Sequence, residues 1–220
     1  MTTTTAFTDL DEPTYVDVSA RHRLSALALA GAGIGIVVGH LLTVPSDQDM
    51  SPYLDQLAAH RTTGVLGGLL TAAGAFLVLP GLVAALRLVQ DRGARIATAG
   101  AIAAGVGIAS LGAGDVMLTL VMGGLVEKHR DTAEALYRIA DSEPLLSLPF
   151  AFAPLFVLGM VLLGVAVLRA RDLPTWLGVL TVAGGLCVPF STAGGPRAFV
   201  TLLPLAAALI ALGVTALRRA

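Results

Sequence analysis

Six long apolar stretches dominate the chain. Most of its surface must therefore be in contact with the interior of a membrane. They cover residues 24–44, 64–89, 96–126, 145–170, 176–190 and 199–217. A helix needs about 20 apolar residues to cross a bilayer, and only the fifth stretch is clearly shorter. Because 13% of the residues are charged, against roughly 25% in soluble proteins, we predict an all-α polytopic membrane protein with six transmembrane helices.

Other fold and function classes fit the sequence poorly. Strands are excluded because no ten-residue alternating pattern appears, and an open sheet edge cannot be satisfied in hydrocarbon. The formal net charge of −1 argues against a nucleic-acid partner. Residues 1–20 are polar, acidic and rich in threonine, so we expect a disordered cytoplasmic tail. Residues 21–220 then form a single six-helix transmembrane domain.

Basic residues flank the apolar stretches unevenly, and this bias predicts the orientation in the membrane. With the N-terminus inside, nine arginines lie in the inner segments: Arg21, Arg23, Arg87, Arg92, Arg95, Arg169, Arg171, Arg218 and Arg219. Five basic residues lie in the outer segments: Arg61, Lys128, Arg130, Arg138 and Arg197. Cytoplasmic loops carry the excess of Lys and Arg. The prediction is a multi-pass protein of the cell membrane with both termini in the cytoplasm.

The two long outer loops resemble one another, and each is expected to end in a short helix. Ser51 followed by Pro52 is typical of a helix start, and Asp131 with Glu134 approximates a capping box. The segment that follows each short helix also aligns, with His60 opposite Asp141. This similarity indicates a two-helix unit used twice in parallel, although shared composition alone would produce the same likeness.

Small residues at four-residue spacing predict where the helices pack most closely, because lipid gives helices no hydrophobic reason to associate. Three such stripes are present: Gly31, Gly35 and Gly39; Gly64, Gly68 and Ala72; and Ala101, Gly105, Ala109 and Ala113. These stripes carry no information about function, because they are common in membrane bundles.

Ionisable residues within or beside the apolar stretches are the candidate site. A charge at membrane depth costs roughly 2.5–3.5 kcal/mol even on an insertion scale, so such residues are functional candidates. The predicted binding residues are His40, His60, Asp115, Asp141 and Glu143, all placed toward the outer side. Asp115 and His40 are the candidates for acid–base catalysis, and we expect them to line one outward-facing cavity. The alternative is that the histidines are interfacial and that Asp115 is held by a structural hydrogen bond.

Sequence motifs of known chemistries are mostly absent. There is no His-Glu-x-x-His zinc motif and no phosphate-binding Gly-x-x-x-x-Gly-Lys loop. No metal site is predicted, and no cofactor is required. A b-type haem held by His40 and His60 as axial ligands is the one cofactor that the histidine positions allow.

The overall plan resembles that of uncharacterised small multi-pass membrane proteins of actinobacterial type. The likeness is carried by the segments AAHRTTGVLGG and LPGLVAALRLV and by the stretch around Asp115. The resemblance implies no activity.

Three function classes follow from these patterns. The first is binding or transport of a lipid or small hydrophobic molecule in an outward-facing intramembrane cavity. The second is a membrane-embedded enzyme that acts on an isoprenoid or lipid by Asp/His acid–base chemistry. The third is an accessory or signalling subunit of a membrane complex. The expected partners are the bilayer, a lipid-like ligand and further copies of the chain.

Overall fold

The computed structural model describes residues 18–45, 49–90, 93–142, 151–191 and 195–220, and the parts it describes are helical without a strand. The helices are α1 (Val18–Leu42), α2 (Met50–Ala59), α3 (Arg61–Leu88), α4 (Ala94–Leu125), α5 (Arg130–Ser142), α7 (Ala153–Arg169), α8 (Thr175–Cys187), the 3-10 helix η1 (Val188–Ser191) and α9 (Gly195–Arg219). The all-α prediction is therefore confirmed for these residues.

Four helices are long and apolar enough to cross a membrane, namely α1, α3, α4 and α9. The remaining two of the six predicted spans correspond to shorter helices, since α7 has 17 residues and α8 has 13. At about 1.5 Å per residue α8 is roughly 20 Å long, less than the ~30 Å hydrocarbon core. Six transmembrane helices are therefore not confirmed. Residues 145–150 of the fourth predicted span lie outside the described residues.

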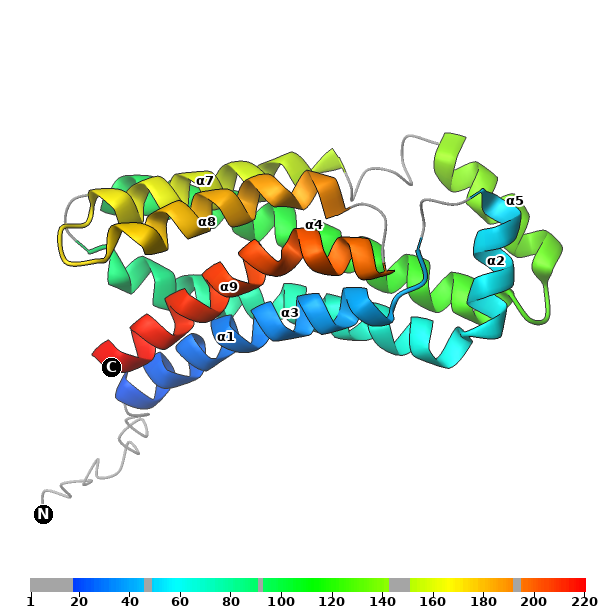
Figure 1. Cartoon of the computed structure of the whole chain (residues 1–220), viewed down its shortest axis with the longest axis horizontal. Helices are drawn as coiled ribbons and strands as arrows, with labels where there is room; N and C mark the ends of the chain where they lie inside the picture. The colour runs from blue at the N-terminus through cyan, green and yellow to red at the C-terminus, as the bar shows by residue number, and fades with distance from the viewer. Residues whose placement is uncertain (1–17, 46–48, 91–92, 143–150, 192–194) are drawn as a thin grey trace, which may run out of the picture.

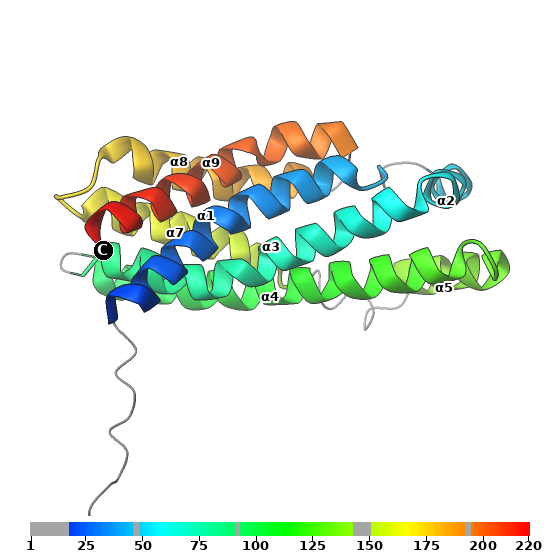
Figure 2. The ribbon, with the colours of Figure 1, turned by 90° about the horizontal axis from the view of Figure 1, so that it is seen from below.

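The six apolar helices form a closed ring in chain order. Each packs against the next, from α1 to α3, α4, α7, α8 and α9, and α9 returns to contact α1. Figures 1 and 2 show them as one elongated bundle, with the start of α1 and the end of α9 at the same end. One continuous apolar cluster fills the interior, with Leu29, Val78 and Leu209 among its fully buried members.

Glycine lets backbones approach closely at the interfaces around this ring. The closest positions, judged by what an added Cβ would meet, are Gly39 and Gly74 between α1 and α3; Gly68 between α3 and α4; Gly107 and Gly159 between α4 and α7; Gly164 and Gly178 between α7 and α8; Gly184 between α8 and α9; and Gly33 and Gly213 between α9 and α1. Small side chains are needed there because they permit close van der Waals contact of backbones within lipid.

The predicted small-residue stripes were partly right. Gly35 and Gly39 of the first stripe do face α3, at Gly74 and Thr71. The stripe on α4 also faces α3, but an added Cβ on Gly105 would lie at an ordinary 3.6 Å from leucine side chains there. The close backbone contacts of α4 are made with α7, through Gly100, Ala104 and Gly107.

The short helices α2 and α5 lie at one end of the bundle, beyond the ends of α1 and α9 (Figure 1). A separate apolar cluster joins them to the end of α4, with Leu54, Leu57, Met122, Val126 and Ala133 buried in it. We call α2, α5 and this cluster the cap. The presence of a short helix in each long loop is thus confirmed.

The helix boundaries near the cap and the tail differ from the predictions. α2 begins at Met50, so Ser51 and Pro52 lie inside its first turn. α5 begins at Arg130, and Asp131 lies in its first turn rather than at the cap position. α1 begins at Val18, so residues 18–20, expected in the tail, are helical. Residues 1–17 lie outside the described residues. The parallel repeat stays a prediction.

Candidate functional site

His40 of α1 makes polar contacts within its own helix and with α3. Its Nδ1 lies 2.9 Å from the backbone oxygen of Ile36 and 3.4 Å from Oγ1 of Thr71. Because a carbonyl oxygen can only accept, Nδ1 carries the proton and donates to Ile36. The hydroxyl of Thr43 in turn donates to the His40 carbonyl, at 2.9 Å. These contacts join the end of α1 to α3.

His60 lies at the junction of α2 and α3, and its side chain is exposed. Its backbone takes part in the turn, since the carbonyl accepts hydrogen bonds from Gly64 N and from the Thr63 hydroxyl, both at 2.9 Å. Over the described residues, no three His, Cys, Asp or Glu side chains gather in a way that could hold a metal ion. The haem held by His40 and His60 stays an untested prediction.

The acidic candidates are placed only by their backbone or not at all. Asp115 lies in α4, one helical turn from both Gly112 and Thr119, which contact α3. Asp141 lies in the last turn of α5. The side chains of these two residues, and the whole of Glu143, lie outside the described residues. The expected pairing of His40 with Asp115 across one cavity is therefore untested.

A groove lies at the opposite end of the bundle from the cap, between the start of α1 and the end of α3. Its volume is about 190 Å³. Six residues line it: Arg21, His22, Ser25, Val83, Ala84 and Arg87. The lining is therefore amphipathic. It combines two guanidinium groups, an imidazole and a hydroxyl with the apolar side chains of Val83 and Ala84.

Both guanidinium groups of the groove are exposed at their helix ends. Among the residues that the structure describes, neither Arg21 nor Arg87 makes an ion pair or a side-chain hydrogen bond. The positive charges of the groove therefore remain available to an anion. In the sequence, these arginines indicated only the topology. They also flank two consecutive spans, and consecutive spans are usually neighbours, so their closeness in space could have been predicted.

The groove belongs to a strongly basic end of the bundle. Eight arginines lie there, at helix ends and in the α7–α8 turn: Arg21, Arg23, Arg87, Arg95, Arg169, Arg171, Arg218 and Arg219. Asp172 is the one described acidic residue among them, and its backbone oxygen accepts a hydrogen bond from Arg219. This end therefore carries a concentrated positive charge.

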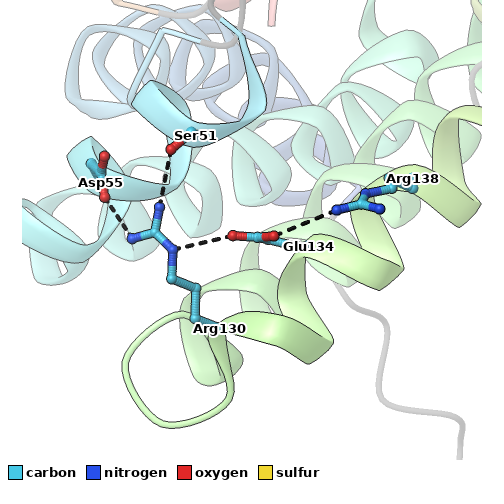
Figure 3. A network of polar contacts seen from close by, with 5 residues as sticks. All are labelled: Ser51, Asp55, Arg130, Glu134 and Arg138. Carbon is cyan, nitrogen blue, oxygen red and sulfur yellow. Dashed lines mark hydrogen bonds and ion pairs between the residues drawn. The ribbon is translucent and has the colours of Figure 1, made fainter.

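The cap carries the largest polar network of the described residues (Figure 3). Arg130 of α5 reaches α2, where it lies 2.5 Å from Asp55 and 3.3 Å from Ser51. The same guanidinium lies 3.3 Å from Glu134, which also pairs with Arg138 at 3.6 Å. These pairs are largely exposed, so they fix the relative placement of α2 and α5 more than they add stability.

Two further contacts lie beside and within the cap. Arg61 donates to Glu127 at 2.7 Å and to the Gly123 carbonyl at 2.6 Å, which joins α3 to α4. The rings of Tyr53 and Tyr137 lie 5.9 Å apart between α2 and α5. Burial, and secondarily Tyr137, raises the pKa of the Tyr53 hydroxyl above its ordinary value.

Long apolar helices, glycine-mediated packing and a one-sided arginine excess together define an integral membrane protein of the all-helical, multi-pass class. Residues 24–217 match the family model described as a domain of unknown function, DUF4386. This match covers most of the chain, so the protein belongs to that family, and the predicted resemblance to an uncharacterised group is confirmed at that level. Neither the curated proteins nor the solved structures give a match.

Proposed function

We propose that the protein binds a membrane lipid, and that the groove between α1 and α3 is its binding site. The observation that carries this proposal is the amphipathic lining, in which Arg21 and Arg87 stand beside Val83 and Ala84. A lipid has the matching chemistry, with a polar head group joined directly to apolar chains. The bound head group would lie among the polar residues while the chains remain in the bilayer.

The size of the groove favours a ligand that is only partly enclosed. Pockets that bury a whole small molecule usually measure about 300–1,000 Å³, whereas this groove measures about 190 Å³. Closer to the middle of the same two helices, Leu77 is 40% exposed and lies against Gly31 at the seam between α1 and α3. A lipid tail along this seam would explain how a small groove holds a large ligand.

Binding has more support than transport or catalysis. A transporter of this kind would place its substrate near the bilayer midplane, but a continuous apolar cluster with contributions from all six bundle helices occupies that region. An acid–base enzyme needs paired reactive groups, but His40 is hydrogen-bonded to Ile36 and lies near Thr71.

The proposal includes an orientation. Basic residues favour the cytoplasmic side, so the arginine-rich end of the bundle faces the cytoplasm. The start of α1 and the end of α9 lie at that end. The cap then lies on the outer side of the cell membrane. In this arrangement α7 and α8 complete six crossings, with local thinning of the bilayer around the shorter helices.

The test is native mass spectrometry of the full chain purified in mild detergent, with lipids identified after release. We expect co-purified lipid on the wild type. Val83→Trp would fill the groove with a bulky ring and remove most of that lipid. Val179→Trp is the control, because Val179 is also well exposed but lies on α8, away from the groove. Absence of lipid from the wild type, or equal lipid on both variants, contradicts the proposal.

A further inference from the structure

We infer that the lipid in the groove is an anionic phospholipid whose phosphate lies between Arg21 and Arg87. This inference rests on the proposed function and specifies its ligand class. The two arginines come from different helices, 66 positions apart in the sequence, yet they line one groove. Two arginines that line one groove form a local site for a single anion. Arginines that only set the orientation in the membrane would not need to share a groove.

Hydrogen-bond chemistry favours a phosphate group in this position. A guanidinium presents its N–H donors in a planar fork that matches phosphate oxygens, often in a bidentate manner. Ser25 adds a hydroxyl and His22 an imidazole to the same lining. The groove thus offers donors from four side chains, and its lining contains no carboxylate that would repel an anion.

Helix electrostatics supports the same ligand. Arg21 lies in the first turn of α1, the end of a helix at which anions are stabilised, and Ser25 lies one turn further along. Arg87 lies in the last turn of α3, where its charge offsets the partial negative charge of that helix end. The positive end of α1 and the arginine of α3 therefore act on the same ligand.

The acidic N-terminal segment of the chain is the competing occupant. Residues 1–17 contain Asp9, Asp11, Glu12 and Asp17, which could also pair with the two arginines. A phospholipid accounts better for the rest of the groove, because Val83 and Ala84 form an apolar wall. An acidic peptide would leave that apolar surface without a partner.

The experiment measures lipid selectivity in the full chain by native mass spectrometry with equal amounts of phosphatidylglycerol and phosphatidylcholine. Phosphatidylcholine carries the same phosphate but also a cationic choline, for which the groove lining offers no carboxylate, so we expect roughly tenfold selectivity for phosphatidylglycerol. Arg21→Gln with Arg87→Gln should reduce that ratio to about one. The control is Arg95→Gln with Arg171→Gln, which removes two exposed arginines from the same end but outside the groove, and it should keep the selectivity.

The outcomes separate this inference from the proposed function. Equal binding of the two lipids by the wild type overturns the inference while lipid binding itself stands. Absence of any bound lipid overturns both. Displacement of the lipid by inorganic phosphate at the same concentration would assign the groove to the free anion and also overturn the inference.

A tail variant tests the competing occupant. Asp9→Asn, Asp11→Asn, Glu12→Gln and Asp17→Asn together neutralise the N-terminal segment. If the arginine substitutions still abolish selectivity in this background, the lipid assignment is supported. If they no longer have an effect, the arginines act through the tail, and the inference is wrong.

Discussion

Replacement of Gly159 by alanine tests the packing of α7 against α4 at its tightest point. An added Cβ would lie 2.6 Å from Ala104 Cα and 2.6 Å from the Gly100 carbonyl oxygen, and closer still to Ala104 N. Ordinary contacts begin at 3.4 Å, so the helices must separate by at least about 0.8 Å. The obstacles are backbone atoms, which no side-chain rotation can move.

The expected magnitude follows from two opposing terms. Overpacking of this kind costs about 1–3 kcal/mol, and separation of the helices also weakens the contacts along the remaining interface. The helix propensity of alanine over glycine returns at most about 1 kcal/mol. We expect a net loss of about 2 kcal/mol in the free energy of unfolding, which corresponds to a midpoint roughly 4–8 °C lower for a chain of this size.

Thermal unfolding in detergent, followed by circular dichroism, measures this loss. Gly105→Ala and Gly124→Ala are the controls, because the first would meet only ordinary contacts and the second nothing within 4 Å. Helix propensity alone should leave both midpoints unchanged or raise them by at most about 2–4 °C. Ala104→Gly should not rescue Gly159→Ala, since the clash is with the backbone of residue 104. An unchanged midpoint for Gly159→Ala, or a rescue by Ala104→Gly, would refute the reasoning.

Two further predictions concern the cap. Leu54→Ala removes a side chain that is fully buried between α2 and its neighbours. It should lower the free energy of unfolding by about 2–5 kcal/mol and speed amide hydrogen exchange in α2. Thr62→Ala, at an exposed position, should leave exchange in α2 unchanged, and unchanged exchange in Leu54→Ala would show that the cap is not held by this cluster. The raised pKa of Tyr53 means that its contribution to stability is complete below about pH 10, its ordinary pKa, and is lost as the pH rises through the higher folded value. Exchange in α2 should therefore increase above pH 10 in the wild type and less in Tyr53→Phe, and an equal increase in both would contradict this role.

Much of the fold could be predicted because it depends on local properties of the chain. The helices follow from long apolar stretches and their flanking basic residues, and both cap helices were expected in the outer loops. The boundaries were less predictable. Ser51 and Asp131 have the residue types of helix caps, yet each lies inside the first turn of its helix. Other residues nearby can also occupy the position at which a helix begins.

The candidate site was harder to predict than the fold. The candidate residues were the ionisable ones near the predicted outer side, because burial of a charge is costly. The sequence does not show whether a hydrogen-bond partner compensates for that cost. His40 has hydrogen-bonding partners one turn away and on α3. The groove arginines were passed over because exposed arginines at helix ends are ordinary, and only their shared groove makes them unusual.

The amino-acid sequence by itself determined that most of the surface of this protein faces lipid and which segments form its long apolar helices, because hydropathy is a property of each segment alone. Only the tertiary structure decided which glycines touch, since contact at Gly159 depends on how two helices are rotated and aligned. It also brought Arg21 beside Arg87 and Arg130 beside Asp55. Residues far apart in a chain become neighbours through packing, which local composition does not specify.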